Sequence, residues 1–314
     1  MINDLLVALS ADSRCVITPI DGGHWLHLSG LDINADQGLV DGLVQDEIFT
    51  HALTEWHPRP HFFERDDQFM AIIKAPNLNI DGKVEDMVAL RFYTDGQHIF
   101  SCSIAAIVSV TEVQQIARER LLTVDALFAK MSLVITGKLR RAVADVIDAL
   151  DILEDQGLDP TETLDASALL LLRRKIIGFK RTSASQSTLF LDLAEASNRA
   201  KTPLMRERFE QLHNANTRID EILDALRQRA ESVSQLVETE SRKTVEKFTY
   251  LLTIAAGIFL PLNLIAGLFG ANVGGLPLTT DSAGFSYLLL MLAGAGLVSL
   301  AISVVILRWI DKRR

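Results

Sequence analysis

The pattern of apolar and polar residues changes twice along this chain of 314 residues, and the larger change lies near its end. Two uncharged apolar stretches, 248–270 and 285–307, flank a short segment, 271–284. Each stretch has about 23 residues, roughly 34 Å as a helix, which is long enough to cross the core of a bilayer. The sequence therefore predicts two transmembrane helices that form a hairpin, with the segment 271–284 as its loop.

The first part of the chain, to about residue 112, has the short apolar runs and turn signals of a mixed α/β domain. Asp21-Gly22-Gly23 predicts a turn, and apolar residues at helical spacing predict a helix over 36–56. Asp95-Gly96 predicts a tight hairpin turn between the last two strands. The expected strands are 24–28, 69–74, 86–93 and 98–103. Short strands among helices indicate an α+β fold for this domain.

From residue 113 onward the apolar spacing becomes helical. The run 168–172 is too short to span a membrane and predicts a buried helix. After Pro203, no glycine occurs before Gly257 and no proline before Pro261, which predicts one helix of about 65 residues. We expect its first part to form a stalk and its last part to be the first transmembrane helix. The expected parts are a cytoplasmic α/β domain (1–112), a cytoplasmic helical region (113–203), a stalk helix (204–247), two transmembrane helices (248–270 and 285–307) with an external loop (271–284), and a basic cytoplasmic tail (308–314).

One stripe of this long helix is polar over most of its length. Steps of three and four residues back from Gly270 select small or polar side chains within the span, apart from one leucine, and polar ones below it. Polar side chains within a bilayer usually face a bundle interior or a water-filled cavity, so this stripe is predicted to line a pore. The pore-lining candidates are Thr249, Thr253, Ala256, Leu260, Asn263 and Gly267, and the cytoplasmic continuation is Glu246, Arg242, Thr239 and Gln235.

Structural roles remain open for the same residues. Thr249 and Thr253 can each bond a backbone carbonyl one turn earlier, and Asn263 can satisfy backbone groups freed by Pro261. A second stripe of the helix is apolar and is expected to pack against neighbouring helices. It consists of Ile219, Ile222, Leu226, Val233 and Val237.

The turn Gly270-Ala271-Asn272 follows the first span. Glycine permits a left-handed backbone conformation at the end of a helix. The Asn272 amide offers a neutral oxygen to a hydrated cation. The turn is therefore a candidate selectivity element, with an ordinary helix cap as the alternative.

Charge and sequence motifs argue against several classes of function, and the positions of lysine and arginine predict the orientation of the hairpin. The net charge of −9 argues against a nucleic-acid partner, and no phosphate loop, nucleophile motif or metal-hydrolase spacing indicates an enzyme. Cys15 and Cys102 match no zinc-finger spacing. Lysine and arginine flank the hairpin at both ends but are missing from its loop. By the positive-inside rule, both termini are cytoplasmic.

Candidate metal ligands lie mainly in the soluble part. His57, His61 and Glu64 are the best-spaced set, together with Asp66 and Asp67, but Pro58 and Pro60 disfavour a helix there, and a solvated loop is the alternative. Glu246 is a possible cation attractor near the membrane, with Arg242 one turn away. No histidine or cysteine follows His213, so any zinc that crosses the spans is expected to be largely hydrated.

Taken together, the α/β part, the long helix, the two spans and the Gly-x-Asn turn resemble the CorA superfamily of divalent-cation transporters, although Ala271 stands where the usual signature has methionine. The run 259–277 and the segment Met87-Val88-Ala89-Leu90-Arg91-Phe92 are similar to the ZntB branch. The resemblance implies a funnel-shaped homopentamer in the bacterial inner membrane that transports Zn²⁺ with coupling to protons and without a bound cofactor. We expect Co²⁺, Ni²⁺ and Cd²⁺ to compete. A magnesium or cobalt transporter of the same architecture is the main alternative. A two-span signalling protein is disfavoured because the loop is too short for a folded domain.

Overall fold

A six-stranded mixed sheet forms the centre of the N-terminal part, in the order β1-β2-β6-β5-β4-β3. The structure is a computed structural model and describes residues 12–44, 47–65, 68–158, 164–199, 202–271 and 283–311. Only β2 and β6 pair in parallel; the other neighbours are antiparallel. The strands are β1 (Cys15–Ile20), β2 (Gly23–Ser29), β3 (His61–Arg65), β4 (Gln68–Ala75), β5 (Val88–Thr94) and β6 (Ile99–Ser103).

The central strands are apolar because both of their faces are covered. In β4, Ala71 and Ile73 belong to one hydrophobic core, whereas Met70 and Ile72 belong to the other. All four predicted strands are present, and the β5–β6 hairpin turns at Gly96, whose φ is +91°. The sequence did not reveal the strands β1 and β3.

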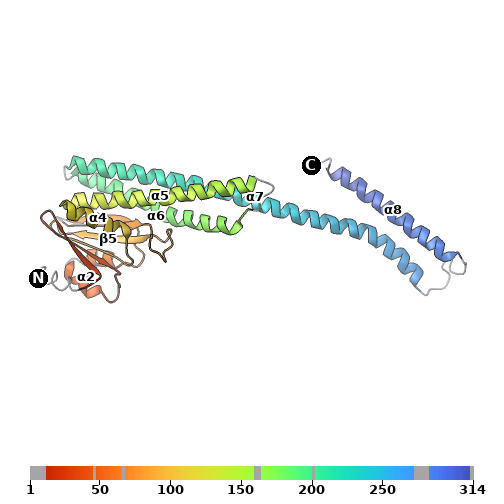
Figure 1. Cartoon of the computed structure of the whole chain (residues 1–314), viewed down its shortest axis with the longest axis horizontal. Helices are drawn as coiled ribbons and strands as arrows, with labels where there is room; N and C mark the ends of the chain where they lie inside the picture. The colour runs from red at the N-terminus through yellow and green to blue at the C-terminus, as the bar shows by residue number, and fades with distance from the viewer. Residues whose placement is uncertain are drawn as a thin grey trace. The chain divides into compact units, whose positions relative to one another are not determined.

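Two layers of helices enclose this sheet (Figure 1). The short helices α2 (Gln37–Leu43) and α3 (Glu47–Thr54) cover one face, together with the second core. The prediction of a single helix over 36–56 is wrong, because Val44 is extended and ends α2. Helices α4 (Val108–Glu119), α5 (Val124–Leu158), α6 (Ala166–Arg199) and the first part of α7 (Pro203–Gly270) contribute to the core on the other face.

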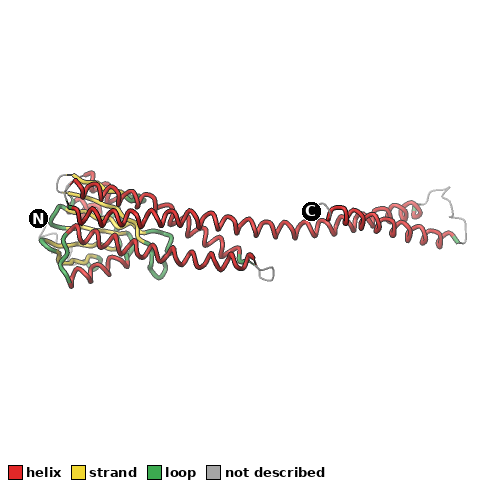
Figure 2. Tube along the Cα trace, turned by 90° about the horizontal axis from the view of Figure 1, so that it is seen from above, coloured by secondary structure: helices red, strands yellow, loops and turns green. Residues whose placement is uncertain are grey.

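The first part of α7 packs in a bundle with α5 and α6 (Figure 2). Its buried residues follow the alternating three- and four-residue spacing of a coiled-coil seam. They are Phe209, Leu212, Asn216, Ile219, Leu223, Leu226, Ala230 and Val233. Asn216 is the one polar member of this seam and donates a hydrogen bond from Nδ2 to Oγ1 of Thr136 on α5 at 3.1 Å. Buried polar pairs of this kind fix the register between helices.

Two details of this bundle differ from the sequence prediction. The seam passes through Leu223, which is fully buried, and Ile222 is only partly covered. Within the run 168–172, Leu169 and Leu172 are buried, whereas Leu170 and Leu171 are exposed. A five-residue apolar run extends more than once around a helix, so a single core cannot cover all of it.

Ion pairs add to the contact of α7 with its two neighbours. Lys180 on α6 bonds Asp220 and Asp224, at 2.7 Å each, and Arg229 pairs with Asp151 and Glu154 of α5. These contacts lie in the first of two units into which the chain divides, Met1–Gln235 and Leu236–Arg314.

The second unit contains the last part of α7 and the helix α8 (Gly284–Asp311). Its two membrane-length apolar segments are Val245–Gly270 and Gly284–Val305. A core helix of a soluble protein would be mostly buried, but none of the 18 most apolar consecutive residues of each segment is buried. The predicted class is confirmed: an N-terminal α/β part, long helices and two apolar C-terminal helices.

Candidate ion-conducting face

The last part of α7 has one face against α8 and another that the hairpin leaves uncovered. A Cβ added at Gly257 would lie 3.9 Å from Oγ of Ser303, and one added at Gly296 would lie 3.9 Å from Cδ2 of Leu262. The two helices therefore approach each other at glycines, as is common for helix pairs in membranes. Sequence reasoning did not single out these two glycines, although small residues within apolar spans are a known signal of close helix packing.

Partial burial identifies the side of α7 that α8 covers. The partly buried residues of the span are Tyr250, Ile254, Ala255, Ile258, Pro261, Leu262, Ile265 and Phe269. At about 100° per residue, these eight positions centre on one direction around the helix. That direction contains Leu262, whose contact with Gly296 was given above.

The predicted pore stripe lies on the opposite side of the same helix. Thr249, Thr253, Ala256, Leu260, Asn263 and Gly267 are all exposed in the single chain. On the same helical projection they centre about 180° from the face that α8 covers. One hairpin therefore leaves its most polar membrane face open. Exposure of such a face to lipid has a high free-energy cost, whereas contact with water or with other protein does not.

Two residues on this face show specific local chemistry. The hydroxyl of Thr253 donates to the carbonyl of Thr249 at 2.8 Å, which is the structural role considered above for threonine in a helix. Such a bond uses the proton and leaves lone pairs of the hydroxyl oxygen able to accept from water. Pro261 lies inside α7 and cannot donate to the carbonyl one turn earlier, and Asn263 lies two residues beyond it.

The cytoplasmic continuation of the stripe is exposed as well. Gln235, Thr239, Arg242 and Glu246 all have exposed side chains on α7. Arg242 lies 4.0 Å from Glu238, one turn before it. Such an exposed pair contributes little to stability.

The end of α7 agrees with the sequence prediction in its position. The amide of Ala271 donates to the carbonyl of Gly267 at 3.0 Å, so the hydrogen-bond pattern of the helix continues one residue past Gly270, where α7 ends. Gly22, Gly30 and Gly96 are the glycines with positive φ in the described residues. Gly270 therefore ends the helix, as expected, without adopting the left-handed conformation that glycine permits. Asn272 and most of the loop lie outside the described residues.

The structure does not assemble His57, His61 and Glu64 into a metal site. His61 and Glu64 lie three residues apart on β3 and so point to opposite faces of the strand. His61 Nδ1 donates to the carbonyl of Arg59 at 2.8 Å, and Glu64 pairs with Arg199. Among the described residues there is no group of three or more His, Cys, Asp or Glu that could hold a metal ion. Asp66 and Asp67 are not part of that description.

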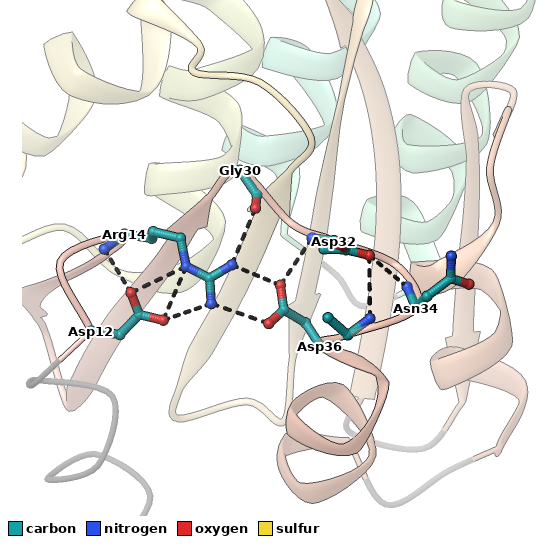
Figure 3. Close-up of polar contacts among 7 residues, drawn as sticks. Asp12, Arg14, Gly30, Asp32, Asn34 and Asp36 are labelled. Atoms are coloured by element: carbon teal, nitrogen blue, oxygen red, sulfur yellow. Dashed lines mark hydrogen bonds and ion pairs between the residues drawn. The ribbon is translucent and has the colours of Figure 1, made fainter.

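Another acidic cluster, beside β1, already contains a cation of the protein itself. Arg14 lies between Asp12 and Asp36, at 2.8 and 3.0 Å, and Asp36 also accepts the amide of Asp32 at 2.9 Å (Figure 3). The hydrogen bonds from Arg14 lower the pKa of both Asp12 and Asp36. This cluster stabilises the β1 region and leaves the carboxylates of Asp12 and Asp36 engaged.

Comparison with known proteins agrees with this architecture. A family model described as "CorA-like Mg2+ transporter protein" matches residues 21–313. The chain belongs to this family, whose members are divalent-cation transporters and not enzymes. It is 28% identical to the divalent cation transporter CmaX of Pseudomonas aeruginosa over 86% of this chain and 82% of that protein. It is 27% identical to the zinc transport protein ZntB of Vibrio parahaemolyticus, over 90% of this chain and 89% of the relative.

Solved structures show the same fold. Full-length CmaX superposes with a TM-score of 0.74 at 24% identity, covering 93% of this chain and 88% of CmaX. The CorA magnesium transporter of Methanocaldococcus jannaschii gives a TM-score of 0.72 at 17% identity, with 90% of each chain covered. The family membership and the two apolar helices identify the chain as a membrane protein that transports divalent cations.

Proposed function

We propose that this chain is a zinc transporter of the bacterial inner membrane, in which a homopentamer surrounds the ion path. The observation that carries the proposal is the uncovered polar face of α7, opposite the face that packs on α8. A two-helix hairpin cannot enclose a path by itself. Several copies around an axis would turn each stripe toward water and each α8 toward lipid.

The residue types on this face suit a hydrated cation. The hydroxyl oxygens of Thr249 and Thr253 and the amide oxygen of Asn263 are neutral, and no histidine or cysteine follows His213. Neutral oxygens can replace part of the water shell but would not hold bare zinc, which prefers nitrogen, sulfur or carboxylate ligands. Weak contacts of this kind permit release, and they also predict competition by Co²⁺, Ni²⁺ and Cd²⁺.

The two ends of the path have different roles in this proposal. Gly270, Ala271 and Asn272 form the selectivity turn at the external mouth, where the Asn272 amide contacts the hydrated ion. On the cytoplasmic side, Glu246, Arg242, Thr239 and Gln235 continue the polar lining. The lysines and arginines that precede the first span and follow the second support cytoplasmic termini in this proposal.

The proposal of zinc as the principal ion rests on the similarity of this chain to zinc-transporting relatives. Several relatives, among them the one from Vibrio parahaemolyticus, are zinc transport proteins. The run Asn272-Val273-Gly274-Gly275-Leu276-Pro277 also resembles the ZntB branch. The proposed coupling of zinc transport to protons rests on the same resemblance to the ZntB branch. A magnesium, cobalt or nickel transporter of the same architecture is the second candidate, supported by the description of the family model and by the fold of the magnesium transporter.

Flux into proteoliposomes separates these candidates. The purified chain is reconstituted, and uptake of Zn²⁺, Mg²⁺, Co²⁺ and Ni²⁺ is measured with and without a pH gradient. We expect saturable zinc uptake that exceeds magnesium uptake and accelerates with the gradient. Magnesium uptake that exceeds zinc uptake would select the second candidate, and equal rates with and without the gradient would remove proton coupling.

A further inference from the structure

The α/β part contains a buried positive charge that no carboxylate of the described residues bonds. Arg91 on β5 has 0% of its surface exposed. Its Nη2 donates to the carbonyl of Glu55 at 2.6 Å, but Nε and Nη1 have no hydrogen-bond partner. An ionised side chain in such surroundings normally has its donors filled, because an unpaired buried charge carries a large desolvation penalty.

A second cation lies on the same face of the sheet. Arg91 is directly opposite Ile72, and Lys74 is directly opposite Ala89, so Lys74 and Arg91 are diagonal neighbours on β4 and β5. Diagonal positions are about 7–8 Å apart, which is within reach of long side chains. Burial lowers the pKa of both groups, and the charge of Arg91 lowers that of Lys74 further. The positive charges of Arg91 and Lys74 therefore repel each other.

The surroundings supply too little negative charge to balance them. Ala89, Ile72 and the fully buried Cys102, which is directly opposite Arg91, are uncharged members of the second core. Burial raises the pKa of the Cys102 thiol to about 12, so the thiol is neutral at pH 7. Glu55 is the one carboxylate that acts electrostatically on both cations among the described residues, and its side chain is exposed. Two positive charges and one negative charge leave a net charge of +1.

We propose that Arg91 and Lys74 bind a small monovalent inorganic anion, such as chloride, on this face of the sheet. The anion accepts from Nε and Nη1 of Arg91 and from the ammonium of Lys74, a residue that is only partly buried. A single negative charge neutralises the cluster together with Glu55, whereas a large or multiply charged anion fits neither the charge nor the burial. The inference does not depend on which cation the chain transports.

Cys102 provides a local probe of this site. Because its thiol is buried beside Arg91, a thiol reagent labels it only when the sheet opens, and opening releases the anion. The experiment uses the full chain in detergent with Cys15 replaced by serine. Chloride is titrated against gluconate, a larger anion, at constant ionic strength and pH. Labelling should slow as 1 + [Cl⁻]/Kd, by about 10-fold when chloride is ten times Kd.

Four variants make the test specific. Lys74→Met and Arg91→Met should remove the chloride dependence, and Lys175→Met, which changes an exposed lysine of α6, should keep it. Glu55→Gln should shift the dependence to lower chloride, because the net charge of the cluster rises. If Arg91→Met does not fold, the Lys74 and Glu55 variants still decide the question.

The proposal fails if labelling is equally fast at every chloride concentration. If Glu55→Gln accelerates labelling in that case, the Glu55 carboxylate is the counter-ion. The proposal also fails if chloride slows labelling equally in the wild type and in Lys74→Met, which is a general salt effect.

Discussion

The first and the last part of helix α7 use the same three- and four-residue spacing with opposite results. From Phe209 to Val233 the spacing selects a seam that α5 and α6 bury within one chain. From Thr249 to Gly267 it selects a polar face that stays exposed, opposite α8. The first part completes its packing inside one chain, whereas the last part has the arrangement expected of a helix that completes its packing around an axis. The spacing of residues defines one face of the helix, and whether the side chains on that face are apolar or polar decides what can cover it.

The largest expected effect concerns the turn that ends the polar face. Asn272→Ala should abolish zinc flux and leave the oligomer assembled, because it removes the amide that we propose contacts the hydrated ion. Flux into proteoliposomes and the mass of the purified assembly measure the two properties. Normal zinc flux in the assembled variant would contradict the assignment of a selectivity turn.

A change in the middle of the polar face should have the next largest effect. Asn263→Leu replaces an amide by an apolar side chain, which narrows and dries a pore and should strongly reduce flux. Ile265→Leu is the matched control, since Ile265 lies on the side of α7 that α8 covers. Equal flux in the two variants would remove Asn263 from the lining.

In the first part of α7 the corresponding change should reduce stability instead. Leu223→Ala removes a fully buried side chain of the seam and should lower the free energy of unfolding by about 2–5 kcal/mol. Gln228→Ala, at an exposed position five residues further along, should change it by less than about 0.5 kcal/mol. Urea unfolding followed by circular dichroism measures both values. A loss below 1 kcal/mol for Leu223→Ala would show that α7 is not held by this seam.

The ion pairs of the same region should have the smallest effect. Lys180→Ala removes a partly exposed pair with Asp220 and Asp224 and should destabilise by about 0.5–1 kcal/mol. Burial opposes the charge of Lys180, but the hydrogen bonds to the two aspartates outweigh it and raise its pKa.

The pH dependence of that effect follows from the sign of the shift. Because the pKa of Lys180 is higher in the folded chain, the pair stabilises fully below the pKa of an unfolded lysine, about 10.4, and the stabilisation is lost as the pH rises through the folded value. The difference between wild type and Lys180→Ala in urea unfolding should therefore shrink from pH 8 to pH 11. A constant difference would assign the effect to packing of the lysine chain.

Local signals in the sequence predicted much of this fold. Asp95-Gly96 was sufficient to place the β5–β6 hairpin, since a tight turn there requires a residue with positive φ. The lack of helix breakers after Pro203 predicted an uninterrupted helix as far as Gly270. The strand β3 was missed because its sequence, His61–Arg65, does not alternate and its last three residues are exposed.

The remaining differences depend on partners that a sequence pattern does not specify. The sequence alone did not show that Leu223, and not Ile222, belongs to the buried seam. It also did not show that Leu170 and Leu171 are exposed. In each case the residues point in adjacent directions around one helix. The positions of α5 and α6 settle which residues are buried. Likewise, the stripe of polar residues was visible in the sequence, but its placement opposite α8 depends on the packing of Leu262 against Gly296. Arg91 looked like an ordinary strand residue because its burial follows from the helices that cover the sheet.

Cysteine accessibility tests the central claim, that the polar face of α7 lines the ion path, most directly. In a chain with Cys15 replaced by serine, single cysteines are introduced by Thr253→Cys and Asn263→Cys on the polar face, and by Ile258→Cys and Ile265→Cys on the face that α8 covers. Zinc flux is then measured before and after a charged, water-soluble thiol reagent. The account predicts rapid modification and loss of flux at positions 253 and 263, with little of either at 258 and 265. Equal modification of the two faces, or modification only at 258 and 265, would contradict it.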